Sequence, residues 1–191
     1  TVLVHALNLA LEILVLGLNI VDLGISFKVL IDKIKVTDNF NVYYVATNGD
    51  DSNSGTYWKP WKTLAKASGG FETDGNGGFL NPGDRVLFRS GDTFKGELKV
   101  KRSGIEDNPI VISYYGPGEL PILSGSGNVS GGDYLSAVNL VNASHITMSH
   151  LWIKNDRQND TRYGWNEKKS YGIYCQANKW GGTSSGLTFN N

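Results

Sequence analysis

Residues 81–104 read NPGDRVLFRSGDTFKGELKVKRSG, and residues 108–127 read NPIVISYYGPGELPILSGSG. Short runs of apolar and β-branched residues alternate here with turns of glycine, proline and asparagine, a pattern typical of strands and tight turns. Glycine accounts for 24 of the 191 residues, against a usual share of about 7%. This part of the chain is therefore predicted to be an all-β solenoid.

The segment before it, residues 42–67, reads VYYVATNGDDSNSGTYWKPWKTLAKA. An aromatic strand pattern is followed by a turn cluster rich in Asp, Asn, Gly and Ser, and then by a short helical pattern that Pro60 opens. We expect this helix to span residues 60–68, with Trp61, Leu64 and Ala65 on one face.

Five motifs in these stretches resemble the start of right-handed parallel β-helix proteins of the polysaccharide-lyase type, such as chondroitinase B and related alginate lyases. They are a YYV strand, a GDDSNSGT turn, a PWKTL capping helix, a PGDRV strand entry and an SGIEDNPIVI coil, at residues 43–45, 49–56, 60–64, 82–86 and 103–112. The resemblance is densest to residue 126 and continues as looser coils to residue 191. It implies the β-helix fold, but a fold does not fix an activity.

Two later segments, HITMSHLWIKN at residues 145–155 and TSSGLTFNN at residues 183–191, look like successive coils. Leu151 and Leu187 are taken as equivalent positions, and Asn155 and Asn191 as members of an asparagine ladder between coils. The polar residues 156–170 are expected to bulge outward as a loop.

The N-terminal segment has a different composition: residues 1–36 read TVLVHALNLALEILVLGLNIVDLGISFKVLIDKIKV. Its polar residues recur at helical spacings and fall on one narrow stripe, which predicts an apolar helix. Such a helix would be about 54 Å long at about 1.5 Å per residue, longer than the ~30 Å hydrocarbon core of a bilayer.

Three interpretations of this segment compete. A cleavable signal peptide would begin with Met and a basic region, which the segment lacks. A membrane anchor would explain the apolar length, although Glu12, Asn19 and Asp22 would be costly in mid-span. The interpretation we favour packs many copies of the helix side by side, as in a filament core.

The layout of an apolar N-terminal helix followed by a β-rich head resembles the type IV pilin superfamily, including archaeal pilins and archaellins. Position 1 is Thr where the bacterial pattern has an aromatic residue, and position 5 is His where it has Glu. The resemblance implies an assembly helix, and we assign its contacts to five residues: Leu14, Leu16, Leu18, Glu12 and Asp22.

The predicted fold class is mainly β: the start of a right-handed parallel β-helix, preceded by a long apolar N-terminal α-helix. Residues 1–40 form the assembly or anchoring helix. Residues 41–191 form the N-terminal cap and first coils of the β-helix head, which we expect to continue beyond residue 191.

Catalytic residues are not assigned within this segment. A lyase needs a base and a group that neutralises a uronate carboxylate, and a glycosidase needs two facing carboxylates. The basic side chains weighed for such a role are each better explained as surface or strand positions: Lys99, Lys101, Arg102, His145, His150, Lys154 and Arg157. His145 and His150 flank one strand and are expected on opposite faces.

Three kinds of binding or modification site are predicted. Asn48, Asp50, Asp51 and Asn53 lie in a Gly-rich loop as oxygen ligands of the type that Ca²⁺ prefers, although an Asx turn bonded to its own backbone explains them better. Of the tryptophans that could stack on sugars, we select those set among polar loop residues, Trp165 and Trp180. N-x-[ST] sequons mark glycosylation at Asn128, Asn142 and Asn159.

Charge and cysteine content exclude several classes of protein. Eighteen Lys and Arg balance eighteen Asp and Glu, so a nucleic-acid partner attracted by overall charge is not expected. Cys175 is the one cysteine, which excludes an intramolecular disulfide and a cysteine-based zinc site. No cofactor is expected apart from the Ca²⁺ site.

The predicted function is an extracellular or cell-surface filament subunit that displays its β-helix head for adhesion or carbohydrate contact. Its partners would be copies of itself through the helix, polysaccharide, and the membrane during assembly. The alternative is a secreted or membrane-tethered polysaccharide lyase whose catalytic coils lie beyond residue 191.

Overall fold

The computed structural model describes residues 40–71, 78–125, 136–155, 171–177 and 183–190. The chain divides between Asn39 and Phe40, so every described residue belongs to the second unit. Within these ranges the elements, in chain order, are β1 (Val42–Val45), α3 (Leu64–Gly69), β2 (Arg85–Arg89), β3 (Thr93–Lys95), β4 (Leu98–Val100), β5 (Ile110–Tyr115), β6 (Ile122–Ser124), β7 (Ser136–Val141), β8 (Ile146–Ser149), β9 (Trp152–Lys154), β10 (Tyr171–Gln176) and β11 (Leu187–Asn190).

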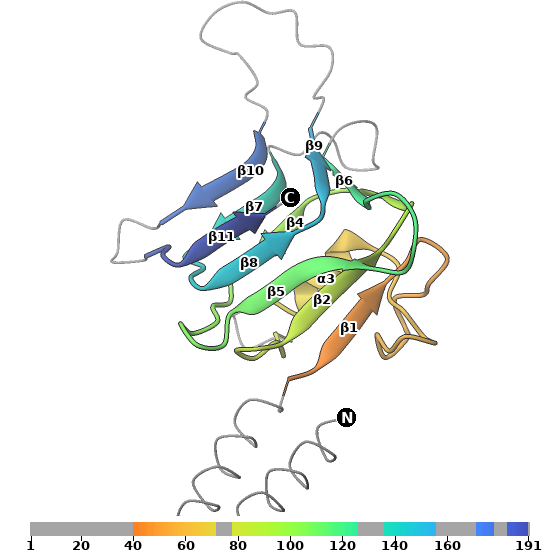
Figure 1. The fold of residues 1–191 in the computed structure, drawn as a ribbon, viewed down its shortest axis with the longest axis horizontal. Coiled ribbons are helices and arrows are strands. Elements are labelled where there is room, and N and C mark those ends of the chain that lie inside the picture. The colour runs from red at the N-terminus through yellow and green to blue at the C-terminus, as the bar shows by residue number, and fades with distance from the viewer. Residues whose placement is uncertain (1–39, 72–77, 126–135, 156–170, 178–182, 191) are drawn as a thin grey trace, which may run out of the picture. The chain divides into compact units, whose positions relative to one another are not determined.

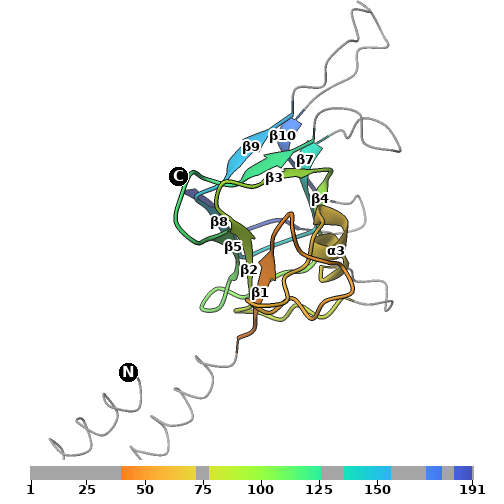
Figure 2. The same ribbon diagram turned by 90° about the vertical axis from the view of Figure 1, so that its right-hand side faces the viewer.

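The strands form three sheets in which every pairing is parallel (Figure 1). One sheet has the order β1-β2-β5-β8-β11, the second β10-β7-β4 and the third β3-β6-β9. The chain therefore visits the three sheets in turn, as β2-β3-β4, then β5-β6-β7, then β8-β9-β10. Figure 2 shows these sheets arranged around one interior.

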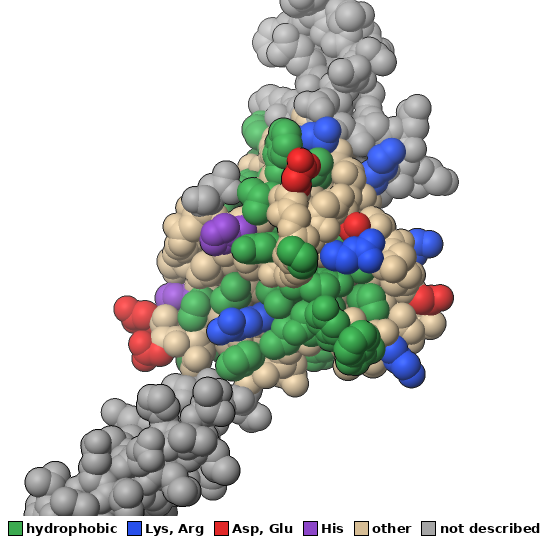
Figure 3. All heavy atoms as spheres, turned by 45° about the vertical axis from the view of Figure 1, so that its right-hand side comes forward, with side chains coloured by type: hydrophobic (Ala, Val, Ile, Leu, Met, Phe, Trp, Pro, Cys, Tyr) green, Lys and Arg blue, Asp and Glu red, His purple; other side chains and the backbone are tan. Residues whose placement is uncertain are grey.

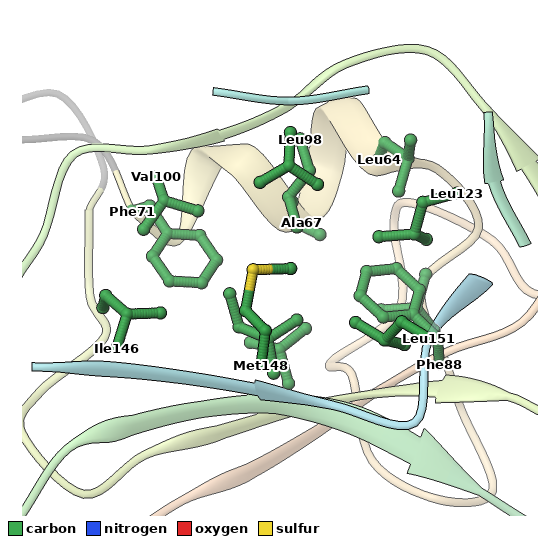
Figure 4. Packing of buried hydrophobic residues seen from close by; sticks show 14 of the residues in the cluster. Leu64, Ala67, Phe71, Phe88, Leu98, Val100, Leu123, Ile146, Met148 and Leu151 are labelled. Carbon is green, nitrogen blue, oxygen red and sulfur yellow. The ribbon is translucent and has the colours of Figure 1, made fainter. Parts of the chain in front are cut away.

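The interior is filled by side chains that the strand register aligns. On the five-stranded sheet, Val86 pairs with Ile112 and Ile112 with Met148, and all three are buried. They meet residues of the other sheets, including Leu98 of β4 and Leu123 of β6, in one hydrophobic core (Figure 4). Because alternate residues of each strand face inward, the remaining residues form an outer surface on every sheet.

The edge of β1 is covered by residues 55–61. The amide of Tyr44 donates to the Gly55 carbonyl at 2.7 Å, the amide of Trp61 donates to the Tyr44 carbonyl at 2.9 Å, and that of Ala46 donates to the Trp61 carbonyl at 2.8 Å. An exposed strand edge invites pairing with other chains. This segment removes that edge and fixes its own backbone to β1.

The helix α3 lies beside β4, where the Lys99 amide donates to Ser68 Oγ at 3.0 Å (Figures 1 and 2). It is shorter than the predicted helix over residues 60–68, because Thr63 is its N-cap and accepts from the Lys66 amide at 3.1 Å. Trp61 is therefore not helical but bridges to Val45. Leu64 is buried as expected, whereas Ala65 is exposed.

A serine ladder joins successive turns of the solenoid. The Ser144 amide donates to Ser103 Oγ at 2.9 Å, and the Ser185 amide donates to Ser144 Oγ at 3.1 Å, each pair 41 residues apart. The expected asparagine ladder stays a prediction, because Asn191 lies outside the described residues. Asn155 donates to the Tyr171 carbonyl at 3.1 Å. Leu187 pairs with Ile146 and not with Leu151.

The predicted fold class is wrong in its helical part. It required a long apolar N-terminal α-helix, whereas the described chain is mainly β with parallel sheets, and its helix α3 has six residues. Among the described residues, no helix has both the length and the apolar character needed to cross a membrane. The prediction rested on the helical spacing of polar residues alone, a local pattern in residues 1–36 that lies outside the described residues.

The residues assigned to helix assembly all lie outside the described residues: Leu14, Leu16, Leu18, Glu12 and Asp22.

Candidate functional site

Four aromatic rings gather on the outer side of the five-stranded sheet, and we call Tyr44, Tyr57, Trp58 and Tyr115 the aromatic cluster. Tyr57 is its centre, with ring centroids 5.3 Å from Tyr44, 5.0 Å from Trp58 and 5.7 Å from Tyr115. Tyr44 and Tyr115 also meet edge to face at 4.9 Å. Edge-to-face contacts of this kind are favourable because a positive ring edge meets a negative ring face.

Two elements and one turn position these rings. Tyr44 lies on β1 and Tyr115 ends β5. Tyr57 and Trp58 are the two central residues of a tight turn that the Lys59 amide closes by donating to the Thr56 carbonyl at 3.0 Å. The turn extends from the segment that covers the edge of β1, which brings its two aromatic side chains next to the strand residues.

The base of the turn is fixed to the protein interior through Trp61. This side chain is 2% exposed, stacks on Tyr43 with ring centroids 4.9 Å apart, and donates from Nε1 to the Asn53 carbonyl at 3.0 Å. Gly55 lies against the indole, so closely that a β-carbon there would be 2.6 Å from it. The aromatic turn is thus held from behind by packed and hydrogen-bonded groups.

The aromatic cluster is open to solvent at its turn. Trp58 is 87% exposed and Tyr57 51% exposed, and hydrophobic side chains gather on this side of the molecule (Figure 3). Large apolar side chains are usually buried, and a contiguous exposed group of them commonly marks a binding surface. A tryptophan this exposed on a supported turn is a candidate ligand contact.

A polar network borders the aromatic cluster. Arg89 of β2 is the register partner of Tyr115. Its guanidinium donates to both carboxylate oxygens of Asp92, from Nε to Oδ2 at 3.0 Å and from Nη2 to Oδ1 at 2.8 Å, and from Nη1 to Asn48 Oδ1 at 2.7 Å. Asp92 Oδ2 also accepts from the Thr47 amide at 2.8 Å. A two-point contact of this kind fixes the plane of the guanidinium.

The charges of this network stabilise each other. The hydrogen bond to Asp92 raises the pKa of Arg89. Burial acts to raise the pKa of Asp92, but hydrogen bonds from Arg89 and Thr47 outweigh burial and the pKa is lowered. Burial, opposed by Arg89, raises the pKa of Tyr115. At neutral pH the site therefore holds a carboxylate, a guanidinium and a protonated phenol.

This arrangement suits a ligand with an apolar face and a polar rim. Exposed aromatic rings offer flat apolar surfaces, and the guanidinium, the phenols and the Asn48 amide offer hydrogen bonds from fixed positions. A sugar ring has both properties, because one of its faces carries C–H groups and its rim carries hydroxyls. Glycoside hydrolysis needs two facing carboxylates, and Asp92, the carboxylate of this network, is bound to Arg89.

The predicted calcium ligands are bonded to the protein itself. Asp51 accepts from the amides of Lys62 and Thr63 at 2.8 and 2.9 Å and from Thr63 Oγ1 at 2.6 Å. Asp50 accepts from Ser52, a bond that lowers the pKa of Asp50, and Asn53 donates to the Pro60 carbonyl at 3.0 Å.

Among the described residues, no group of three or more His, Cys, Asp and Glu side chains could hold a metal ion. The calcium site stays a prediction.

The other predicted sites are only partly within the described chain. Trp165, Trp180, Asn128 and Asn159 lie outside it. Asn142 has a left-handed backbone with φ 50°, and its amide donates to the Gln176 carbonyl at 2.9 Å.

The basic residues weighed for catalysis are not gathered in one site. Lys99 lies 3.8 Å from Glu97, and Arg102 donates to the Leu80 carbonyl at 2.9 Å. His145 and His150 flank β8, as expected, and His150 contacts the ring of Tyr114 at 5.3 Å. Arg157 lies outside the described residues.

A hollow of about 500 Å³ lies elsewhere, by β8, β9 and β11. Its lining is mostly apolar and contains no titratable side chain: Leu120, Met148, Ser149, Leu151, Trp152, Ile153, Ile173, Phe189 and Asn190. It has hydrogen-bonding side chains in Ser149 and Asn190 but lacks the charged groups that border the aromatic cluster. The aromatic cluster is therefore the better candidate site.

The sequence pattern pointed to Trp165 and Trp180 as sugar contacts and to no member of the aromatic cluster. Tyr44 and Tyr115 were assigned to strands, and the side of the sheet that they occupy follows from register. The available signal was Tyr57-Trp58 between Gly55 and Pro60, two large aromatics in a turn where polar residues are usual.

Comparison with solved structures finds a likeness to one glycoside hydrolase. The chain matches no protein-family model. A crystal structure of a GH136 lacto-N-biosidase from Eubacterium ramulus, as the selenomethionine derivative, is 25% identical with a TM-score of 0.56, covering 78% of this chain and 27% of that one. The native form of the same enzyme gives 24% and 0.55 over the same shares.

Two further similar proteins provide less information about function. The uncharacterized protein YwoF of Bacillus subtilis strain 168 is 32% identical over 146 residues, which are 75% of this chain and 28% of YwoF. A rhamnogalacturonan lyase matches 58% of the chain at 22% identity and a TM-score of 0.43, too low to support an argument. The chain spans little more than a quarter of the length of these relatives, and none of them is a pilin or chondroitinase B.

Proposed function

We propose that this chain binds carbohydrate through the aromatic cluster, as part of a secreted or cell-surface carbohydrate-active protein. The observation that carries the proposal is Trp58, 87% exposed on a turn that Trp61 and Gly55 fix to the interior. A rigid exposed ring loses little conformational entropy when a ligand stacks on it. Tyr115, which contacts Tyr57, and its register partner Arg89 provide polar groups at the border of the aromatic cluster.

The likeness to the GH136 lacto-N-biosidase supports a role with sugars. That enzyme's fold covers 78% of this chain at 25% identity. Polysaccharide cleavage by a lyase or a hydrolase is accordingly our proposal for the whole protein. For the described residues the geometry favours binding, because Asp92 is bound to Arg89, whereas hydrolysis needs two facing carboxylates.

Isothermal titration of the purified chain with a panel of soluble oligosaccharides tests this proposal. Trp58→Ala should weaken binding of any oligosaccharide that binds the wild-type chain by about tenfold or more, since truncating a tryptophan that anchors a ligand commonly costs about 2 kcal/mol or more. Trp152→Ala is the matched control, because Trp152 is also exposed, at 59%, but lies on β9. Circular dichroism should show that both variants remain folded.

Equal loss of affinity in the two variants would mean that the aromatic cluster is not the sugar site. Absence of binding across the panel would remove the proposal altogether.

A further inference from the structure

We infer that the aromatic cluster accepts neutral sugars and disfavours uronates, and that the ion pair of Arg89 with Asp92 sets this preference. The inference rests on the proposed function and adds the class of sugar. It concerns the one guanidinium that adjoins the aromatic cluster in the described chain. An unpaired arginine at that position would attract a sugar carboxylate.

The position of Arg89 makes it a ligand contact. It is the register partner of Tyr115 on the neighbouring strand, and its side chain is 35% exposed. Tyr115 contacts both Tyr44 and Tyr57. A sugar stacked on the aromatic cluster therefore has the guanidinium at its edge.

Most N–H donors of the Arg89 guanidinium are already hydrogen-bonded within the protein. Nε and Nη2 bind the two oxygens of Asp92, Nη1 binds Asn48 Oδ1, and Nη2 also approaches Thr47 Oγ1 at 3.5 Å. A uronate carboxylate is recognised best by two parallel N–H donors of one guanidinium. The edge that would supply this pair of donors is bound by Asp92.

The charge at the site is also compensated. Asp92 lies 2.8 Å from Arg89 and its side chain is 11% exposed, so water screens the pair poorly. A carboxylate that approaches Arg89 also approaches Asp92, and repulsion by the second offsets attraction by the first. A neutral hydroxyl meets no such repulsion and can accept from the second N–H of Nη1, whose first N–H binds Asn48.

One other cation lies near the aromatic turn. Lys59 follows Trp58 and is exposed, and an exposed ammonium gains little from a single ion pair because water and salt screen it. Asn48, also exposed, is held by Arg89 through Oδ1 and presents its amide N–H groups. The fixed groups around the aromatic cluster are therefore suited to hydroxyls.

Matched ligand pairs test the inference in the wild-type chain. Neutral oligomers of galactose, glucose and mannose are each compared by isothermal titration with the uronate oligomer of the same sugar, at low and at high salt. We expect the affinity of the chain for a neutral oligomer that it binds to be about tenfold or more higher than its affinity for the uronate counterpart. Its affinity should change little with salt, because no charge is neutralised on binding.

Asp92→Asn then removes the compensating charge. Affinity for the uronate oligomer should rise by about tenfold and fall again with salt, while affinity for the neutral oligomer stays similar. Asp107→Asn, an exposed substitution of the same kind, should change neither. If Asp92→Asn fails to fold, the wild-type comparison alone decides.

Two results would overturn the inference, and they differ in what they mean. A wild-type chain that prefers the uronate, in a salt-sensitive manner and with loss of binding in Trp58→Ala, would leave the carbohydrate site standing and refute its neutral preference. A chain that binds neither member of any pair would refute the carbohydrate site as well.

Discussion

Gly55 lies against the indole of Trp61, where a β-carbon would be 2.6 Å from Cε2 and 2.8 Å from Cζ2. Gly55 also has a φ of 80°, a conformation that side chains with a β-carbon adopt at a cost. The turn that carries Tyr57 and Trp58 begins at this contact. The position of the exposed rings therefore depends on a glycine that faces the interior.

Gly55→Ala should destabilise the fold by about 1–3 kcal/mol, through backbone strain and a clash with a fully packed ring. It should also weaken sugar binding, because Tyr57 and Trp58 must move with the turn. Urea denaturation measures the first effect and titration calorimetry the second.

Gly91→Ala is the control for strain without a clash. Gly91 has a φ of 77°, and nothing lies within 4 Å of where its β-carbon would be. It should cost about 1–2 kcal/mol from strain alone and leave sugar binding intact. If Gly91→Ala weakens binding as much as Gly55→Ala, the packing of the turn is not what positions the rings.

Asp51→Ala should lower stability by about 1–2 kcal/mol, because it removes the acceptor of the Lys62 and Thr63 amides next to the start of α3. Thermal denaturation with calcium and with a chelator measures whether a metal is involved. If Asp51 acts only through these hydrogen bonds, Asp51→Ala should lower the melting temperature equally with calcium and with chelator.

A wild-type melting temperature that rises with calcium, and no longer does so in Asp51→Ala, would instead establish the calcium site predicted from residues 48–53.

The pair of Arg89 and Asp92 predicts an acid-sensitive contribution to stability. The folded-state pKa of Asp92 is lowered, so its contribution is fully present above the unfolded-state pKa of about 3.9. It is lost as pH falls through the lower folded-state pKa. The free energy of unfolding of the wild-type chain should therefore drop between about pH 4 and more acidic values.

Asp92→Asn should show a smaller drop over this interval, whereas Asp107→Asn should keep the wild-type profile. Chemical denaturation at several pH values makes the comparison. Parallel profiles for the wild type and Asp92→Asn would show that this ion pair does not couple to folding.

Ile112→Ala should cost about 2–5 kcal/mol, because Ile112 is fully buried between Val86 and Met148 and its removal leaves a cavity. Val111 precedes it on the other side of the sheet and is only half-buried, so Val111→Ala should cost clearly less. A similar loss in both variants, measured by urea denaturation, would contradict the inward register of β5.

The β-rich part of the chain could be anticipated because its signals are local. The YYV run is β1, the Gly-Pro-Asn turns separate short strands, and Ile146 to Ser149 forms a strand between two histidines. Coil alignment could not be anticipated, since it depends on which residues pair across the sheet. Leu187 pairs with Ile146, and the repeated Leu and Asn residues in the sequence did not indicate this register.

The candidate site was largely hidden from sequence inspection for the same reason. Tyr44 and Tyr115 are 71 positions apart in sequence. Their rings meet across β2, because β1 and β5 are the two neighbours of β2 in the sheet. Arg89 and Asp92 are close in sequence, but their position beside Tyr115 again follows from register. Composition favoured tryptophans in polar loops, whereas the structure points to one on a turn supported by Trp61.

The most direct test of the sugar site is fluorine NMR of the chain labelled with 5-fluorotryptophan. The resonance of Trp58, assigned from its absence in Trp58→Phe, should shift when a neutral oligosaccharide that binds the chain is added, while that of the buried Trp61 should shift far less. An unchanged Trp58 resonance at ligand saturation would contradict binding at the aromatic cluster.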